Sequence, residues 1–443
     1  MILSVMPSRA CGSACSSLQF VARETLTGVF TSPAARTLSA RRLPHCRPPQ
    51  PRNPFIRSVH SRSFYSTPER NSQTSRISYR VAVSSSGKNR THLTAKNVYN
   101  FNPDVHDAIG VAVDTQNPAV KRRQRPDSGE DAFFVSKIGR PETPDNSIAF
   151  AIADGVGGWA ESRVDPADFS HGLCGYMAQT ALDWAQPAEQ LRAKVLLQKG
   201  YDQLVADESI NAGGSTASVG VGFDDGRVEL ANLGDSGSVL LRQAAVHHYS
   251  IPQTHGFNTP YQLSIIPPRM RRQASIFGGS YLEDRPCDAI TTNLHMQHGD
   301  VLLLATDGVF DNLNNQDILK LVTSRMIYTG AWTASTSPNT GIVPAPRERL
   351  KQLTGSEGLA ALDSSKSESA KKTKPATASN PHDHTYTLQS LIAATVAREA
   401  KLASMDLRRD SPFAKEAQRY HPGDYYRGGK VDDIAVLVVV AVE

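Results

Sequence analysis

The chain alternates between short apolar runs, which often end in a carboxylate or a glycine, and longer stretches with helical spacing. The apolar run at 147–153 predicts a buried strand, because an unbroken apolar segment of this length suits a strand covered on both faces. Similar runs predict strands at 215–223, 227–232, 238–242, 301–305 and 434–442. Helical spacing predicts helices at 169–184, 187–206, 318–326 and 387–402. Because strands and helices occur in separate groups, they favour a layered α+β domain.

Two polar, Ser-rich segments interrupt this pattern. Residues 67–99 are predicted to be a disordered linker, and 333–384, which are rich in Ser, Thr, Pro, Ala and Lys, a disordered insertion in a surface loop. The folded domain is therefore expected to span 100–443 around that insertion.

The first 66 residues differ from the rest in charge. They are rich in Arg, Ser and Pro, contain no Lys or Asp, and have Glu24 as their single acid. This composition predicts a mitochondrial presequence, and Arg62 to Ser66 resembles a matrix-processing sequence, so we expect a mitochondrial protein of the matrix. A disordered basic tail and a plastid transit peptide are the other interpretations.

Cysteine and hydropathy patterns exclude several classes of protein. Three of the five cysteines lie in the expected presequence, and only Cys174 and Cys287 remain, which we expect to be buried thiols. They allow no disulfide framework, which favours a reduced, intracellular protein. No apolar run reaches the ~18 residues of a membrane span. The basic run Lys371 to Lys374 has no interleaved aromatic residues, so we expect no nucleic-acid partner.

Carboxylates at the ends of predicted strands are the candidate chemistry. Asp154 follows the strand at 147–153, Asp307 follows 301–305, and Asp432 precedes 434–442. Glu130-Asp131 and Asp235 flank other predicted strands. Each Asp-Gly alone is typical of an ordinary turn. Bringing all of these carboxylates together, however, is strongly unfavourable without cations, and sites built only from oxygen ligands select Mg²⁺ or Mn²⁺. Two such ions about 3.5–4 Å apart can activate a water and clamp a phosphate.

The order of these motifs resembles the type 2C (PPM) protein phosphatases, from about residue 100 to the end, without the insertion. The matching segments are G-E-D-A at 129–132, A-D-G-V-G-G-W at 153–159, G-G-S-T-A at 213–217, N-L-G-D-S at 232–236, A-T-D-G-V-F-D at 305–311 and D-D-I-A-V at 432–436. The form D-G-V-G-G-W, with a presequence, most resembles the mitochondrial subgroup linked to coenzyme Q synthesis. The resemblance implies a four-layer α-β-β-α fold, with a central antiparallel β-sandwich and a dinuclear metal site at its edge.

The resemblance also implies a role for each matching residue. Asp154 is expected to bridge two Mg²⁺ or Mn²⁺ ions, the Gly155 carbonyl to bind one, and Asp307 and Asp432 to hold the other, so that Asp154, Asp307 and Asp432 are the catalytic set. Glu130 and Asp131 complete the shell, Asp235 and Asp311 match positions that bind a weaker third ion, and Asp433 has an orienting role at most.

The implied activity is metal-dependent hydrolysis of phosphoserine and phosphothreonine in mitochondrial proteins. The expected partners are phosphoprotein substrates, with coenzyme Q biosynthesis enzymes among the candidates, and the expected state is a monomer.

Two departures from the family pattern concern the substrate. Val156 stands where many members have a His that protonates the leaving group, which leaves a water as the candidate acid. Pro126 stands where many members have the phosphate-holding Arg, and Arg122, Arg123 and Arg125 are the candidate replacements.

Two other functions were weighed. A catalytically weak phosphoprotein-binding scaffold of the same fold predicts a missing metal ligand, and none is missing. A metal-dependent esterase or nuclease usually includes a His among its ligands, and no His lies in these motifs.

Overall fold

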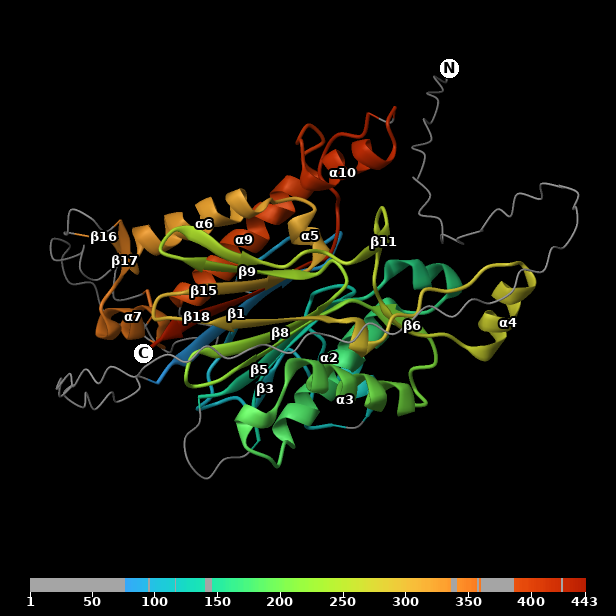
Figure 1. Ribbon diagram of the computed structural model, residues 1–443, viewed down its shortest axis with the longest axis horizontal. Helices are drawn as coiled ribbons and strands as arrows, with labels where there is room; N and C mark the ends of the chain where they lie inside the picture. The colour runs from blue at the N-terminus through green and yellow to red at the C-terminus, as the bar shows by residue number, and fades with distance from the viewer. Residues whose placement is uncertain are drawn as a thin grey trace, which may run out of the picture. The chain divides into compact units, whose positions relative to one another are not determined.

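Two antiparallel β-sheets form the centre of the domain (Figure 1). The computed structural model describes residues 76–94, 96–115, 117–139, 146–335, 341–356, 358–359, 386–423 and 425–443. The expected presequence at 1–66 and residues 336–340, 357 and 360–384 of the expected insertion lie outside these residues.

The first sheet is built around the C-terminal strand. Its strand order is β10-β9-β15-β18-β1-β2. The bounds are β10 Ala245–Tyr249, β9 Gly237–Arg242, β15 Val301–Ala305, β18 Ile434–Val442, β1 Ser78–Ser86 and β2 Val98–Phe101. Every residue of β18 is buried, since β15 and β1 pair with its two edges and both of its faces are covered. This explains why the sequence of β18 is continuously apolar.

The second sheet has the order β14-β8-β7-β5-β4-β3. The bounds are β14 Ile290–His295, β8 Arg227–Leu233, β7 Ala217–Gly222, β5 Ile148–Asp154, β4 Asp131–Lys137 and β3 Ala108–Ile109. Side chains such as Phe133 and Phe150 meet Leu304 and Val439 of the first sheet in the layer between the two sheets. The predicted strands therefore exist, and they form a sandwich.

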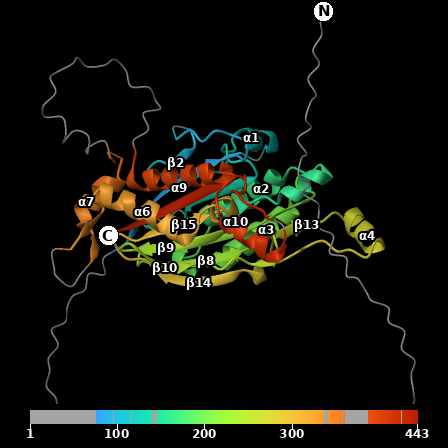
Figure 2. The same ribbon diagram turned by 90° about the horizontal axis from the view of Figure 1, so that it is seen from above.

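Helices cover the outer face of each sheet (Figures 1 and 2). On the second sheet lie α2 (Pro166–Leu182) and α3 (Ala193–Ala206), and on the first lie α6 (Asn315–Tyr328), α7 (Arg347–Thr354) and α9 (Leu388–Met405). The four-layer α-β-β-α fold is thus confirmed. The remaining helices are α1 Pro118–Arg123, α4 Pro268–Ile276, α5 Asp307–Phe310 and α10 Pro412–Tyr420. The remaining strands are β6 Gly213–Ser215, β11 Thr254–Gly256, β12 Thr259–Pro260, β13 Leu263–Ile265, β16 Trp332–Ala334 and β17 Ile342–Pro344.

The predicted disordered linker at 67–99 is wrong from Ser78 onward. Alternate residues of β1, namely Tyr79, Val81 and Val83, point into the layer between the sheets, while the whole strand pairs with β18. The Ser-rich end of β1 looks like a linker by composition, but Ser84, Ser85 and Ser86 are fully buried.

Two further boundaries are corrected. The expected insertion at 333–384 contains an ordered β17 and α7, whose Leu350 and Leu353 are buried against the first sheet's helical layer. The helix expected from 187 begins at Ala193, because a short 3-10 turn at Ala188–Gln190 comes first.

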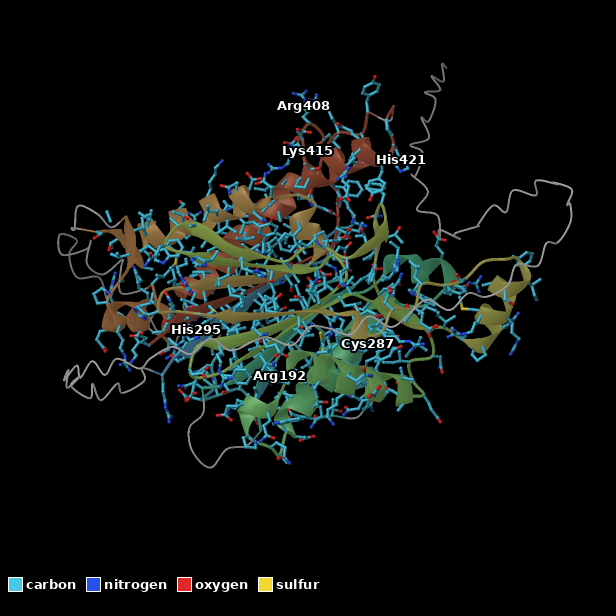
Figure 3. All side chains as sticks on the ribbon, in the orientation of Figure 1. Arg192, Cys287, His295, Arg408, Lys415 and His421 are labelled. Carbon is cyan, nitrogen blue, oxygen red and sulfur yellow. The ribbon has the colours of Figure 1, made fainter. Side chains whose placement is uncertain are left out.

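The two cysteines of the described part differ. Cys174 is buried in α2 as expected, whereas Cys287 is exposed near one end of β14, so the expectation that it is buried is wrong (Figure 3). None of the described helices combines the length and the apolarity that a bilayer crossing requires.

The corrected boundary predicts what a shortened chain will do. A chain that begins at Arg76 should unfold cooperatively on heating, as the longer chain does. A chain that begins at Asn100 should lose cooperative unfolding, because β18 would expose one full edge and Val81 and Val83 would leave the core. Circular dichroism during heating distinguishes the two, and a cooperative transition for the shorter chain would contradict the assignment.

Candidate active site

Two acidic side chains face each other at one end of the second sheet. Asp131 is the first residue of β4 and Asp154 the last of β5, and the strand register places them directly opposite each other. Opposed residues of an antiparallel pair have Cβ atoms about 4.5–5.5 Å apart. The structure therefore brings these two predicted residues together.

A glycine allows the chain to approach this pair closely. The Gly155 amide donates to the Glu130 carbonyl over 3.1 Å. A Cβ atom at Gly155 would lie 2.8 Å from that carbonyl and from the Pro166 carbonyl, so no other residue fits without a shift. Gly155 thus allows the end of β5 to pack closely against the segment before β4 and against the start of α2.

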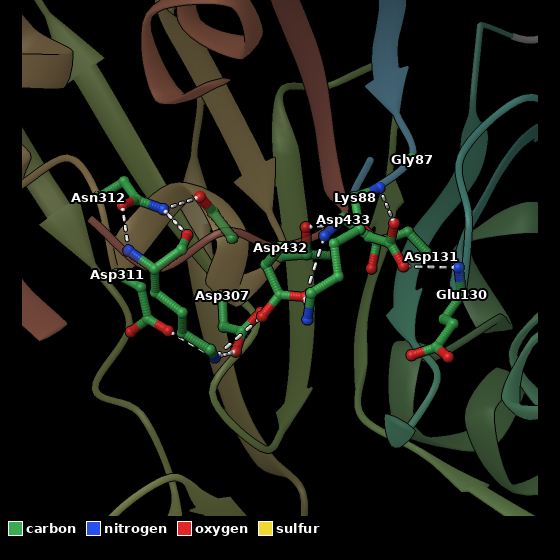
Figure 4. Close-up of polar contacts among 12 residues, drawn as sticks. Gly87, Lys88, Glu130, Asp131, Asp307, Asp311, Asn312, Asp432 and Asp433 are labelled. Atoms are coloured by element: carbon green, nitrogen blue, oxygen red, sulfur yellow. Dashed lines mark hydrogen bonds and ion pairs between the residues drawn. The ribbon is translucent and has the colours of Figure 1, made fainter. Parts of the chain in front are cut away.

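The first sheet contributes Asp307 and Asp432 to the same region. Asp307 follows β15 and opens α5, and Asp432 lies just before β18, which pairs with β15. A Cβ at Gly308 would lie 1.9 Å from the Asp433 carbonyl oxygen, so this glycine also permits a close approach of two chain segments. Figure 4 shows Asp307, Asp432 and Asp131 gathered at this edge.

Thr306 and Asp433 join the two sheets at the site. The Thr306 hydroxyl donates to Asp131 over 2.8 Å and accepts the Ala435 amide over 3.1 Å. Asp433 accepts the Glu130 amide over 2.8 Å with one oxygen and the Lys88 amide with the other. Both oxygens of Asp433 therefore hold backbone segments in place.

A lysine that the sequence analysis missed lies among the carboxylates. The Lys430 ammonium donates to Asp307 over 2.5 Å and to Asp311 over 2.7 Å, and it lies 3.1 Å from Asp432. Its only sequence signal is its place two residues before Asp432. Since only 17% of the Lys430 side chain is exposed and its ammonium is paired with all three carboxylates, its charge compensates them rather than serving the surface.

The pKa values show how far this compensation reaches. Burial would raise the pKa of Asp307, but the Lys430 ammonium and its hydrogen bond hold that pKa below its ordinary value. Burial and the neighbouring carboxylates raise the pKa of Asp131, Asp154 and Asp235 well above the ordinary value. Lys430 therefore compensates one side of the cluster and leaves the other with uncompensated charge.

Glu130 and Asp311 lie at the margins of the cluster. Burial, then the charges of Asp433 and Asp432, raise the pKa of Glu130 to about 7. Burial raises the pKa of Asp311 to about 7 as well, against the opposing effect of Lys430. The Glu130 side chain turns toward Gly157, where an added Cβ would lie 2.9 Å from one of its oxygens.

The donor set fits a hard divalent cation, although it is not a closed cage. Among the described residues, no three His, Cys, Asp or Glu side chains converge tightly enough to hold an ion. However, one buried oxygen of Asp131 and one of Asp235 have no hydrogen-bond partner in the described part of the chain. Buried carboxylate oxygens without partners are costly unless a cation binds them, and oxygen donors suit Mg²⁺ and Mn²⁺.

Two of the candidate phosphate-binding arginines are engaged by carboxylates at the start of α2. Arg122 and Arg125 form ion pairs with Asp168 of α2 at 2.6 and 2.5 Å, and Arg123 is exposed on α1. By contrast, Lys88, directly after β1, lies 3.4 Å from Asp432 and keeps about half of its side chain exposed. Lys88 is thus a cation at the site that solvent and substrate can reach, and it comes from the segment predicted to be linker.

Comparison with known proteins agrees with this geometry. The family model described as protein phosphatase 2C matches residues 121–337. The Saccharomyces cerevisiae "Protein phosphatase 2C homolog 7, mitochondrial" is 34% identical over 266 residues, which cover 59% of this chain and 74% of the relative. The Schizosaccharomyces pombe "5-azacytidine resistance protein azr1" is 31% identical over 326 residues, which cover 73% and 85%. The solved photosystem II phosphatase PBCP is 24% identical, with coverages of 71% and 92% and a TM-score of 0.47.

These matches and the site define the class of protein: the chain belongs to the protein phosphatase 2C family. It is a serine/threonine protein phosphatase, and members of its family use Mg²⁺ or Mn²⁺.

The buried lysine predicts a measurable competition with metal. In EDTA, Lys430→Met should lower the free energy of unfolding by about 3 kcal/mol, because removing one partner of a buried network leaves its charges uncompensated. Saturating Mn²⁺ should raise the Tm of this variant more than that of the parent protein. Lys415→Met is the matched control, since Lys415 lies exposed on α10. Equal Mn²⁺-induced Tm shifts for Lys430→Met and the parent would contradict the assignment.

Proposed function

We propose that this phosphatase hydrolyses phosphoserine and phosphothreonine in mitochondrial proteins, with divalent cations bound at the carboxylate edge of the sandwich. The observation that carries the proposal is the set of buried carboxylates with unpartnered oxygens and raised pKa values. Near neutral pH such a set must take up either protons or cations to neutralise its charge, and it lies at the edge where the two sheets meet.

The residues proposed to hold the ions are those that the site brings together. Asp154, Asp307 and Asp432 are the central set, with Glu130, Asp131 and the Gly155 carbonyl completing it. Asp235 and Asp311 border the same cluster and are proposed for a third, weaker ion. The chemistry that bound Mg²⁺ or Mn²⁺ supplies is activation of water and neutralisation of phosphate charge.

The chain's own side chains position the substrate. We assign the phosphate-binding role to Lys88, because its ammonium is exposed beside Asp432 while Arg122 and Arg125 are held by Asp168. Val156 cannot donate a proton, so the leaving alkoxide takes its proton from water.

Two observations support a mitochondrial location in the matrix. The Arg-rich, acid-poor segment 1–66 has the composition of a presequence, and the yeast relative is named mitochondrial. The D-G-V-G-G-W motif resembles the subgroup linked to coenzyme Q synthesis, so enzymes of that synthesis are proposed substrates. A catalytically weak phosphoprotein-binding scaffold is the second candidate, and the complete carboxylate set argues against it.

Activity should depend on the Asp154 carboxylate, one of the residues proposed to hold the ions. Asp154→Asn should lower kcat for a phosphothreonine peptide in Mn²⁺ by at least about a hundredfold, because it removes charge where the ions are needed. Release of inorganic phosphate measures this, and Asp168→Asn is the control because Asp168 pairs with Arg122 and Arg125 instead. Full activity of Asp154→Asn would reject the proposed centre, and the absence of phosphate release by the parent protein would favour the scaffold.

Lys88 should affect substrate binding more than chemistry. Lys88→Met should raise KM for the phosphopeptide about tenfold, because it removes one charge contact to phosphate, while kcat changes less. Arg123→Met, an exposed residue on α1, should leave KM unchanged. If the KM of Lys88→Met equals that of the parent, then a group other than Lys88 binds the phosphate.

A further inference from the structure

A cavity of about 310 Å³ opens directly beside the carboxylate cluster. This whole cavity is called here the flanking pocket. One part of it is lined by Asp235, Asp307 and Asp311. The rest of the lining is mixed. Its aromatic and aliphatic side chains come from three separate segments, namely Phe257 between β11 and β12, Phe310 and Leu313 after β15, and Phe413 of α10, and polar residues such as Asn258, Asn314 and Glu416 lie among them. Helix α10, α5 and β11 gather at this end of the sheets (Figure 1).

The aromatic wall is a built feature rather than a chance opening. The rings of Phe257 and Phe413 are 5.2 Å apart, and the ring of Tyr426 packs against that of Phe413 at 5.4 Å. Asn258, next to Phe257, has a left-handed backbone with φ of 51°, which makes the tight turn at the hairpin tip. Aromatic contacts and a specific turn therefore hold Phe257 in place.

Phe413 is tied to the site itself. Its amide donates to the Asp311 carbonyl over 3.0 Å, and the Lys430 ammonium lies 5.3 Å from the centre of its ring. Ser411 caps α10 by accepting the Ala414 amide over 3.0 Å and donates its hydroxyl to the Gly428 carbonyl over 2.6 Å. Lys415 of α10 extends away from the sheets (Figure 3), whereas the His421 ring after α10 lies edge-on against the ring of Phe257 at 5.4 Å. The apolar wall is thus oriented toward the carboxylates.

We propose that the flanking pocket binds a large apolar side chain within two residues of the phosphorylated Ser or Thr, and so selects substrates; this rests on the proposed function. The pocket and the carboxylates share Asp235, Asp307 and Asp311, so a peptide whose phosphate lies at the carboxylates places its neighbouring residues at the pocket. An extended peptide advances about 3.3 Å per residue, which brings side chains one or two positions away within reach. Phe257, Phe310 and Phe413 are all only partly buried, and an apolar guest would remove their exposed surface from water.

The experiment compares peptides in one assay with Mn²⁺. A phosphothreonine peptide flanked by alanines is the reference, and Leu or Phe replaces alanine singly at each of the two positions before and after the phosphothreonine. At one or more positions the apolar residue should raise kcat/KM about tenfold, mainly through a lower KM. Equal kcat/KM for all of these peptides would overturn the proposal.

Two variants of opposite kind test the pocket. Phe257→Ala removes part of the wall, and Thr254→Trp adds volume at an exposed strand position that lines the pocket. Both should bring the ratio of kcat/KM between the best apolar peptide and the reference close to one. Tyr425→Ala is the matched control, because Tyr425 is 94% exposed and does not line the pocket. Thermal unfolding verifies that each variant folds, and an unchanged ratio in a folded Thr254→Trp would overturn the proposal.

The outcomes separate this inference from the proposed function. Hydrolysis of p-nitrophenyl phosphate requires the carboxylate centre but no flanking residue. If the parent protein hydrolyses neither this compound nor any phosphopeptide, the proposed function fails. If it hydrolyses both, and the peptides show no preference for an apolar neighbour, only the flanking pocket is rejected.

Discussion

Burial and mutual repulsion raise the pKa of Asp131, Asp154 and Asp235, so near neutral pH this edge of the sandwich must bind either protons or cations to neutralise its charge. Lys430 provides that compensation for Asp307, Asp311 and Asp432, and the unpartnered oxygens of Asp131 and Asp235 mark where it does not reach. Folding and metal binding are therefore linked at this edge, because the same carboxylates that destabilise the fold alone are the donors that bind Mg²⁺ or Mn²⁺.

The close approach of the strand ends makes that arrangement rigid. Antiparallel pairing sets Asp131 opposite Asp154, and the pairing of β15 with β18 brings Asp307 near Asp432. Gly155 and Gly308 are required because a side chain at either position would collide with backbone from another segment. The Thr306 hydroxyl links the two sheets, because it donates to Asp131 of the second sheet and accepts the Ala435 amide of the first. The carboxylates consequently cannot spread apart to relieve their repulsion, so they relieve it by binding protons or cations.

The sequence pattern was sufficient for a layered α+β domain and for the residues on the strand ends, because both leave local signals, whereas the sandwich came from what the family resemblance implied. An apolar run followed by Asp-Gly marks Asp154 and Asp307 wherever they lie in the fold. The strand β1 was missed because its buried Ser84, Ser85 and Ser86 have the composition of a linker, and only pairing with β18, more than three hundred residues away, shows that they are core. Lys430 was missed for a similar reason, since the 123 residues that separate it from Asp307 hide the contact from any local pattern.

The substrate side of the site is made by segments without motifs. Lys88 lies two residues after β1, Phe257 at a hairpin tip and Phe413 in α10, whereas the carboxylates lie in the motifs that carry the family resemblance. These side chains contribute less to the charge balance at the sheet edge than Lys430 does: Phe413 contacts the cluster through a backbone hydrogen bond and through its ring beside Lys430, and Lys88 through an exposed ammonium. Chemistry and substrate choice are thus physically separable in this phosphatase: the first depends on buried charge that must be neutralised, and the second on apolar surface that a substrate can cover.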